Sequence, residues 1–343
     1  MGLVSGKEVL ERAYRGGYAI GAFNGTNIEI TRAIIEAAEE ESAPVFLQLS
    51  MGILDYLGFE IGVGMAMAAA SSAKVPVVLH LDHGRNLEQC VLCLRNGFTS
   101  IMYDGTEKLL EEIRAKEGSK GLDRDTLIKA INSREALERN ISETRRIAEI
   151  VHACEIPLEA ELGRIPRDSD FHAAGYEFDN RSGRLTPEAK SFLESLYVVP
   201  DFAEEFVEET GCDSLAIACG SIHGMLAPLR PLNIRRIEEI ASRVDIPLVL
   251  HGTSGVLQKI EDAEKFDLVL EKDEGSIQEA ISAGIAKINV STDLQKVFLK
   301  SVEENFPEKD SGGNLRKIFA GAREKLKDRI RFYIRLFGSS GKA

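Results

Sequence analysis

Residues 76–84 read PVVLHLDHG, a short apolar run rich in β-branched residues that ends in Asp82 and His83. Runs of this kind are typical of buried parallel strands. Seven comparable runs occur elsewhere in the chain, at residues 18–24, 44–50, 100–105, 157–163, 214–220, 247–253 and 287–292. Amphipathic segments typical of helices separate them, for example at residues 27–41, 234–243 and 276–283. Eight strands alternating with helices predict a closed α/β structure, the (β/α)8 TIM barrel, and the main rival is an open doubly wound sheet.

The length of 343 residues, of which 44% are hydrophobic, suits one barrel of roughly 250 residues with insertions. We therefore expect a single domain over residues 1–343. After the fourth strand, residues 106–138 are highly charged and predict an extended loop-helix insertion. After the fifth strand, residues 166–198 form a long, irregular loop that ends in a short helix. An extra amphipathic helix is expected at residues 314–336, followed by a flexible tail, FGSSGKA.

The formal net charge of -13 argues against a nucleic-acid partner. No apolar run approaches the roughly 20 residues that span a membrane, and we find no signal peptide or lipidation motif. We therefore expect a cytoplasmic protein. Cys90 and Cys93 have CxxC spacing, but they lie in an apolar helix-like run without a second pair. We interpret them as reduced core residues rather than as a zinc or redox site.

Polar side chains gather at the carboxyl ends of the predicted strands, the rim that carries the active site of barrel enzymes. They are Asn24, Ser50, Asp82, His83, Asp104, Glu159, Glu161, His223, His251, Asn289 and Ser291. A lone histidine in a strand is usually a core group. Three of the six histidines, however, fall at this one rim: His83, His223 and His251. Their convergence predicts a metal site.

Three neutral imidazoles suit a catalytic zinc ion, because one coordination position stays open for substrate. Asp82 precedes His83, and in an extended strand the two side chains point apart. We expect Asp82 to act as an acid/base group beside the metal, or alternatively to orient a histidine from behind. Glu159 and Glu161 share a strand face, and either could be an alternative ligand or only balance charge. The remaining histidines are expected in the core (His80) or at the surface (His152 and His172).

Glycine-rich turns follow the sixth and seventh strands, at residues 219–224 and 251–255. Backbone N–H groups exposed by glycine can hold a phosphate, especially late in a barrel. Residues 289–293, NVSTD, then begin a helix and add hydroxyl groups. The position of these turns predicts a phosphate-binding site.

PVVLHLDHG and LVLHGTSG, in this order, resemble the class II, metal-dependent fructose-bisphosphate/tagatose-bisphosphate aldolase family. The similarity covers nearly the whole chain outside the two insertions, and includes AFNGTNIE, GFTSIMYDG, LEAELGRI, ACGSIHG, KINVSTDLQ and LFGSSGKA. It implies reversible cleavage of a phosphorylated ketose, similar to fructose 1,6-bisphosphate, to dihydroxyacetone phosphate and an aldehyde through a metal-stabilised enediolate. We also expect a homo-oligomer, a dimer or tetramer, with a role in carbohydrate metabolism such as glycolysis.

The resemblance also implies roles for individual residues. Zinc, or another divalent metal, would bind His83, His223 and His251, and Glu161 would hold the metal in an alternative position. Asp82 would exchange a proton with the substrate hydroxyl when the C3–C4 bond breaks. The residues around dihydroxyacetone phosphate would be Gly224, Gly252, Ser254, Asn289, Ser291 and Thr292, with a monovalent cation near the phosphate. Those near the rest of the sugar would be Asn24 and Ser50.

Three segments depart from the family pattern, and one of them is the helical segment after the fourth strand, which is much longer here than in the family. Where the family has a glutamate that moves a proton at C3, this chain has Ser169 within PRDSD. Asp168 and Asp170 are the preferred replacements, and the same loop also carries Glu177 and Asp179. All four could instead only solvate the loop, in which case Glu159 and Glu161 are next in line. Where the family has a tyrosine-lysine pair, residues 225–227 are Met-Leu-Ala and Arg230 is the nearest cation. The contacts to a distal phosphate therefore differ, and the sugar need not be fructose 1,6-bisphosphate.

Other functions stay open at this point. A Schiff-base (class I) aldolase would need a lysine, and Lys287 is the candidate, although it lies toward the start of its strand. A non-catalytic paralogue that binds a metal and a phosphosugar is a second alternative. A metal-dependent hydrolase is a weaker one, because the phosphate turns would then have no purpose.

Overall fold

The computed structural model describes residues 2–117, 123–176, 185–224, 229–266, 268–306 and 314–343. The strands are β1 (Gly2–Leu3), β2 (Ile20–Asn24), β3 (Val45–Ser50), β4 (Pro76–Gly84), β5 (Ser100–Tyr103), β6 (Leu158–Leu162), β7 (Ser214–Ile217), β8 (Leu232–Asn233), β9 (Leu248–Leu250), β10 (Glu274–Gly275) and β11 (Ile285–Val290). The α-helices are α1 (Gly6–Gly16), α2 (Ile28–Glu40), α3 (Met51–Leu57), α4 (Phe59–Ser72), α5 (Leu87–Arg95), α6 (Gly105–Glu117), α7 (Arg124–Asn132), α8 (Arg134–His152), α9 (Asp168–Ala173), α10 (Pro187–Ser195), α11 (Pro200–Thr210), α12 (Ile234–Ala241), α13 (Ile277–Ser282), α14 (Thr292–Asn305) and α15 (Leu315–Leu336).

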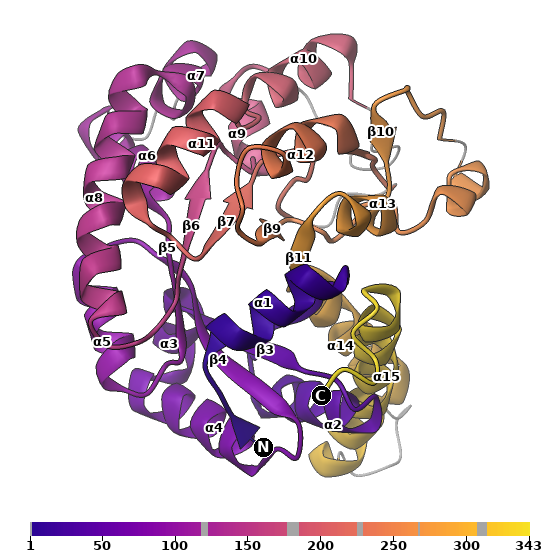
Figure 1. Cartoon of the computed structure of the whole chain (residues 1–343). Coiled ribbons are helices and arrows are strands. Elements are labelled where there is room, and N and C mark those ends of the chain that lie inside the picture. Colours follow the sequence, from indigo (N-terminus) through magenta and orange to yellow (C-terminus); the bar gives the residue numbers. More distant parts are fainter. Residues whose placement is uncertain (1, 118–122, 177–184, 225–228, 267, 307–313) are drawn as a thin grey trace.

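Eight of these strands close into a ring of parallel strands, in the order β2, β3, β4, β5, β6, β7, β9, β11 (Figure 1). The ring closes because β11 pairs with β2 and β4 pairs with β5. The short strand β1 adds to the start of β4, and β8 and β10 form a separate antiparallel pair. The closed ring confirms the predicted (β/α)8 barrel and excludes the open sheet.

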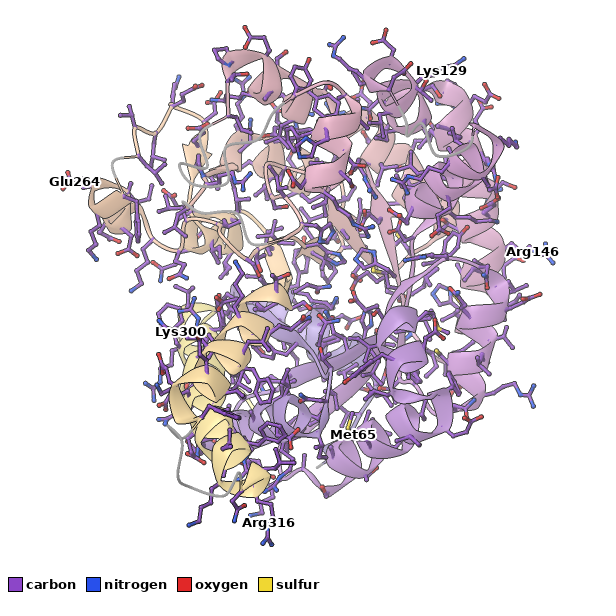
Figure 2. The ribbon with its side chains drawn as sticks, turned by 180° about the vertical axis from the view of Figure 1, so that it is seen from behind. Met65, Lys129, Arg146, Glu264, Lys300 and Arg316 are labelled. Carbon is purple, nitrogen blue, oxygen red and sulfur yellow. The ribbon has the colours of Figure 1, made fainter. Side chains whose placement is uncertain are left out.

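Many of the helices around the barrel begin at a capping residue and bury one face. Asn27 and Asn86 accept hydrogen bonds from the backbone N–H groups of Ile30 and Gln89, at 2.8 and 2.9 Å. In the long helix α8 the apolar residues face the barrel. Charged side chains of the outer helices, such as Arg146 on α8, point outward (Figure 2). Burial of the apolar face is therefore what fixes each helix against its strands.

The two insertions are joined by a core of their own. It contains Leu110, Leu127, Ile131, Phe171, Ala189, Phe192, Leu193, Leu196, Tyr197 and Ile222. These residues come from α6, α7, α9 and α10 and from the segments beside α10 and after β7. The sequence predicts residues 166–198 to be irregular until a final short helix, whereas the structure adds the helix α9. The helix α9 forms because its Phe171 is buried in the apolar core that it shares with the first insertion.

The FGSSGKA tail is ordered, so the prediction of a flexible tail is wrong. Phe337 is 1% exposed and Ser339 is fully buried. The backbone N–H groups of Gly341 and Ala343 donate to the carbonyls of Glu41 and Ser42, at 2.8 and 2.9 Å. Glycine and serine favour turns, and here the turn lies against the end of α2 and places Phe337 in the core.

In the described part of the chain, no single helix is long and apolar enough to cross a membrane. Only α3 and α4 taken together meet the length and composition test, and they are bent by 105°.

We predict that the Glu41 carboxylate, at the end of α2, stabilises the packing of α2 against α15 in a pH-dependent way. Its carboxylate accepts hydrogen bonds from Arg335, Arg331 and Ser340 at 2.7–3.0 Å. Burial would raise the pKa of Glu41, but these partners lower it to about 2. A depressed folded-state pKa stabilises the fold above the unfolded pKa, and this contribution is lost as the pH falls toward 2. Glu41→Gln should lower the free energy of unfolding by on the order of 2 kcal/mol at pH 7.

Urea unfolding at pH 7, 5 and 3.5 checks this. The difference in the free energy of unfolding between wild type and Glu41→Gln should become smaller as the pH falls from 4.5 to 3.5. The control is Glu138→Gln, because Glu138 forms an exposed ion pair, at 2.9 Å, with Arg134 of the same helix α8. This substitution should lower the free energy of unfolding by about 0–1 kcal/mol. Equal losses in both variants, or a difference that does not change with pH, would contradict the prediction.

Candidate metal and active site

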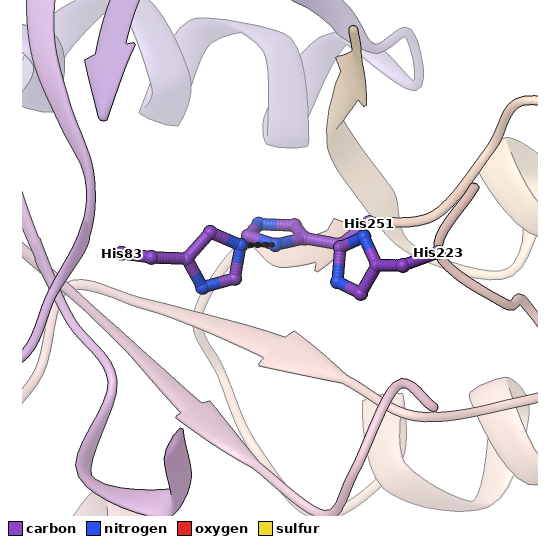
Figure 3. A group of neighbouring side chains, drawn as sticks. All are labelled: His83, His223 and His251. Carbon is purple, nitrogen blue, oxygen red and sulfur yellow. Dashed lines mark hydrogen bonds between the residues drawn. The ribbon is translucent and has the colours of Figure 1, made fainter. Parts of the chain in front are cut away.

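His83, His223 and His251 converge at the carboxyl rim of the barrel, as predicted (Figure 3). Each offers one ring nitrogen, and these atoms all lie within 4.8 Å of one another. The closest pair, Nδ1 of His251 and Nε2 of His83, is 3.2 Å apart. Two nitrogens bound to one tetrahedral zinc ion lie roughly 3.3 Å apart, since each zinc–nitrogen bond is about 2.0–2.1 Å. The donor set therefore fits a small divalent metal ion.

The backbone of His83 explains how the strand delivers this ligand. Its φ is +53°, a left-handed conformation that is rare for residues other than glycine. The pairing of β4 with β5 shifts register between Leu81 and Gly84, as at a β-bulge. The prediction that Asp82 faces away from His83 is wrong, because it assumed a regular strand. Nε2 of His83 lies 3.8 Å from Oδ1 of Asp82.

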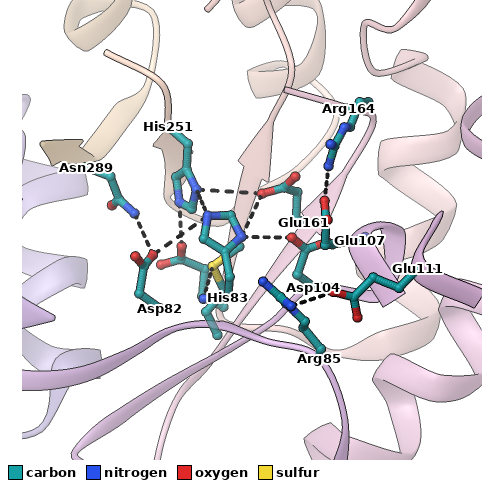
Figure 4. A network of polar contacts seen from close by, with 12 residues as sticks. Asp82, His83, Arg85, Asp104, Glu107, Glu111, Glu161, Arg164, His251 and Asn289 are labelled. Atoms are coloured by element: carbon teal, nitrogen blue, oxygen red, sulfur yellow. Dashed lines mark hydrogen bonds and ion pairs between the residues drawn. The ribbon is translucent and has the colours of Figure 1, made fainter. Parts of the chain in front are cut away.

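Carboxylates hold the second nitrogen of two of the histidines. Nδ1 of His83 lies 2.8 Å from Oδ2 of Asp104 (Figure 4). Nε2 of His251 lies 3.1 Å from Oε1 of Glu159. Such partners fix the orientation and tautomer of a metal-binding imidazole. The sequence marked Asp104 only as a polar strand end and left Glu159 open between ligand and charge balance. In the structure each carboxylate contacts the histidine nitrogen that does not face the other histidines.

Burial and neighbouring charges give the three histidines different proton affinities. Burial lowers the pKa values of His223 and His251 well below their usual range, and the charge of His83 adds to this. Burial also acts to lower the pKa of His83, but Asp82, Asp104 and Glu161 raise it to about 10. A low proton affinity at His223 and His251 favours metal binding there, because a ligand imidazole has to be neutral, whereas binding at His83 would compete with a proton.

Glu161 lies beside this site without a hydrogen-bond partner for its Oε2 in the described part of the protein. That oxygen is 3.6 Å from Nδ1 of His251 and 3.8 Å from Nδ1 of His83. Burial, followed by the charge of Asp104, raises its pKa well above the usual value. His83, Asp104 and Glu161 form a second group whose donor atoms lie within 4.8 Å of one another. This geometry fits the second metal position expected for Glu161.

Asp82 is held at the rim by two amide groups. Nδ2 of Asn24 donates to its Oδ2 at 2.8 Å, and Nδ2 of Asn289 donates to its Oδ1 at 3.2 Å. Asn24 in turn accepts a hydrogen bond from Gln48 at 2.8 Å. Asn24 and Asn289, which the sequence assigned to the sugar, therefore also orient the carboxylate of Asp82.

A cavity of about 700 Å³ opens above the histidines. It is lined by the predicted residues Asn24, Ser50, Asp82, His83, Asp168, His223, Gly224, Gly252, Ser254, Asn289, Ser291 and Thr292, and also by Gln48, Arg85, Glu107, Arg167 and Ser169 among others. Three other predicted site residues, Glu161, Asp170 and His251, are not among its lining residues. Gly252 has a φ of +63°, and a Cβ there would lie 3.0 Å from the backbone of Ile222. The turn thus requires glycine and exposes its backbone to the cavity. The helix α14 begins at Thr292, on the same side.

The structure separates the candidate loop carboxylates. Asp168 lines the cavity. Asp170 is 3% exposed, and its Oδ2 accepts hydrogen bonds from Nε and Nη2 of Arg164, at 3.1 and 2.9 Å, and from the backbone of Arg167, at 2.9 Å. Because Asp170 is bound to the buried Arg164 and does not line the cavity, it is poorly placed for the expected proton transfer. Glu177, Asp179 and residues 225–227 lie outside the described residues.

Several other side chains lie as the sequence predicted. His80 is fully buried beneath the site, 2.8 Å from the hydroxyl of Ser100. His152 and His172 are exposed, and Cys90 and Cys93 are buried free thiols. Lys287 is buried in an ion pair with Glu159, at 2.9 Å, and donates to Oδ1 of Asn289 at 2.8 Å. It does not line the cavity described above.

The chain is similar to known proteins along nearly its whole length. The family described as fructose-bisphosphate aldolase class-II matches residues 4–342. The fructose-bisphosphate aldolase of Thermus caldophilus is 38% identical over 350 residues, which cover 99% of this chain and 100% of the relative. A probable fructose-bisphosphate aldolase of Bacillus subtilis is 34% identical and covers 100% of both chains. The crystal structure of the YdjI aldolase from Escherichia coli K12 has a TM-score of 0.72 at 31% identity and covers 99% of both chains.

Proposed function

The chain belongs to the class II fructose-bisphosphate aldolase family, and from this we propose that His83, His223 and His251 hold a zinc ion that serves reversible cleavage of a ketose phosphate. The observation that carries this proposal is the 3.2 Å approach of Nδ1 of the buried His251 to Nε2 of His83, which lines the cavity together with Asp82 and His223. Bound zinc would supply a Lewis acid that polarises the substrate carbonyl and stabilises negative charge on its oxygen. The remaining steps belong to the side chains and backbone of the chain itself.

The phosphate of dihydroxyacetone phosphate would bind at the turns after β7, β9 and β11. Gly224, Gly252 and Ser254 line this part of the cavity, with Ser291 and Thr292 at the start of α14. Backbone N–H groups and a helix N-terminus favour an anion there, because the helix dipole is positive at that end. The phosphate bound at these turns would therefore fix the position of the substrate relative to the histidines.

Asp82 would accept the proton of the substrate C4 hydroxyl when the C3–C4 bond breaks, and return it in the reverse reaction. Its two amide donors, Asn24 and Asn289, hold the carboxylate at the edge of the cavity. A carboxylate fixed in this way can act without first losing side-chain freedom. The alternative role, orienting a histidine, is less well supported because Nε2 of His83 lies 3.8 Å from Oδ1 of Asp82, beyond hydrogen-bond distance.

Proton transfer at C3 of dihydroxyacetone phosphate would fall to Asp168. It lines the cavity and is partly exposed, whereas Asp170 is buried against Arg164. Oδ1 of Asp168 lies 3.5 Å from Nε2 of the exposed His172, and it is buried without a hydrogen-bond partner among the described residues. A carboxylate oxygen without a hydrogen-bond partner is free to accept a proton from a substrate.

Two alternative functions have less support. A Schiff-base mechanism needs an accessible, neutral lysine, but Lys287 is fully buried in an ion pair with Glu159. A non-catalytic paralogue would not need Asp82 and its two amides held over three convergent histidines. Turnover of at least one ketose from a panel of phosphorylated ketoses, by zinc-loaded protein, separates the proposed enzyme from such a paralogue.

Replacing Asp82 tests its role as the acid/base group. Asp82→Asn keeps the size of the side chain but cannot accept the hydroxyl proton. Turnover should fall by roughly 10²–10⁴-fold, the range for loss of a general acid or base. Elemental analysis should still find one zinc per chain. Asp125→Asn, at the exposed residue Asp125 of α7, is the control and should keep wild-type turnover. Near-normal turnover in Asp82→Asn would instead make Asp82 a group that orients a histidine.

The C3 step can be measured alone, by exchange of the C3 proton of dihydroxyacetone phosphate in deuterated water. Asp168→Asn should slow this exchange by roughly 10²-fold or more. Asp170→Asn should mainly destabilise the fold, by about 3–5 kcal/mol, because it leaves the buried Arg164 without one partner. Wild-type exchange in Asp168→Asn would overturn the assignment and point to Glu159 or Glu161. Slower exchange in an Asp170→Asn protein of wild-type stability would favour Asp170.

A further inference from the structure

The C-terminal helix α15 packs along α14, the helix that begins beside the candidate phosphate site (Figure 1). The rings of Phe298 on α14 and Phe319 on α15 lie with their centroids 5.7 Å apart. Leu326 and Ile330 of α15 are fully buried in the main apolar core. Because its apolar face is fixed there, α15 is a firm support for the start of α14.

Asp293, the second residue of α14, connects this support to the site. Its Oδ2 accepts hydrogen bonds from Nε of Arg329 at 2.6 Å and from the hydroxyl of Tyr333 at 2.8 Å, both on α15. Nη2 of Arg329 also donates to the Tyr333 hydroxyl oxygen, at 3.1 Å. Burial, and then the charge of Asp293, raise the pKa of Tyr333, so its hydroxyl stays protonated and remains a donor. Two donors of α15 therefore hold the Asp293 carboxylate in place.

The backbone of Asp293 in turn places a hydroxyl group of the cavity wall. The N–H group of Asp293 donates to Oγ of Ser254 at 3.2 Å. Ser254 lies in the turn after β9, is 7% exposed and lines the cavity. A hydroxyl oxygen that accepts one hydrogen bond can still donate its own hydrogen to a phosphate oxygen. The direction in which Ser254 donates thus depends on Asp293 and, through it, on α15.

The negative charge of Asp293 gives its pairing with Arg329 a second consequence. Ser291 and Thr292, just before Asp293, line the cavity, so the carboxylate belongs to the same helical turn that would receive the phosphate. A carboxylate at a helix N-terminus stabilises the helix, but it repels a second negative charge nearby. Asp293 is 8% exposed, so salt screens this repulsion only weakly. Arg329, paired with Asp293 at 2.6 Å, offsets the repulsion.

We propose that Arg329 and Tyr333 are positioning residues for the phosphate site. They hold Asp293 so that Ser254 and the first turn of α14 meet a phosphate, and Arg329 also offsets the charge of Asp293. This rests on the proposed function, because it takes the substrate phosphate to bind at these turns. Neither residue lines the cavity, so we expect both to act on phosphate binding and not on bond cleavage.

Binding of sn-glycerol 3-phosphate, which has a phosphate but no ketone, measures this step apart from catalysis. In calorimetric titrations of zinc-loaded protein, Arg329→Gln should weaken binding by about tenfold, because the charge of Asp293 is then uncompensated. Tyr333→Phe removes one donor and should weaken binding by about threefold. Asp293→Asn keeps the side-chain size without the charge. In that background Arg329→Gln should weaken binding by less than about threefold.

Steady-state kinetics give a second readout on any ketose phosphate that the protein cleaves. In Arg329→Gln the KM should rise by about tenfold while kcat stays within about twofold, because binding is lost equally from the ground state and the transition state. The control is Arg323→Gln on the same helix, since Nε of Arg323 lies 3.3 Å from Oε2 of Glu36 and Arg323 does not line the cavity. It should keep the wild-type affinity.

Three results would overturn the proposal. They are wild-type affinity in both Arg329→Gln and Tyr333→Phe, equal weakening by Arg329→Gln with and without Asp293→Asn, and no measurable binding of sn-glycerol 3-phosphate to wild type. Failure of the proposed function looks different. A protein that shows the expected binding pattern but cleaves no ketose phosphate would refute the cleavage reaction and leave the role of α15 in phosphate binding standing.

Discussion

Between Leu81 and Gly84 the strand β4 leaves regular geometry, and the left-handed backbone of His83 places two neighbouring residues at one site. In a regular strand, a ligand and an acid/base group at adjacent positions would point to opposite faces. Gly84 permits the bulge, because a Cβ there would lie 2.8 Å from the carbonyl oxygen of Met102. The metal site and the proton-transfer site therefore adjoin because of this irregularity.

A buried network of charges beneath the rim keeps that arrangement rigid. Lys287 pairs with Glu159, and Glu159 holds His251. Lys287 also donates to Asn289, whose amide donates to Asp82. One lysine in the barrel interior thus supports a candidate metal ligand on one side and the candidate acid/base group on the other. Breaking such a buried pair leaves an uncompensated charge, so the network resists displacement.

The sequence was sufficient to predict the barrel, because apolar β-branched runs and amphipathic segments alternate regularly. The three histidines could be found because parallel strands present their carboxyl ends at one rim. The left-handed backbone of His83 could not be predicted, since it depends on tertiary contacts with Met102. Asp168 and Asp170 carry the same functional group. They differ because Asp170 is buried against Arg164 whereas Asp168 lines the cavity, and no local sequence pattern reveals this difference. The tail was predicted to be flexible from its glycines and serines, but its ordering depends on Phe337 and on the end of α2.

The proposed cleavage reaction depends on three imidazole nitrogens that bind one metal ion. X-ray absorption spectroscopy on protein loaded with one zinc per chain measures this most directly. We expect three imidazole nitrogens at about 2.0–2.1 Å from zinc, with oxygen completing the coordination, and two imidazoles in His251→Ala if any zinc remains. A sulfur shell near 2.3 Å, or a shell dominated by carboxylate oxygen with fewer than two imidazoles in wild type, would contradict it.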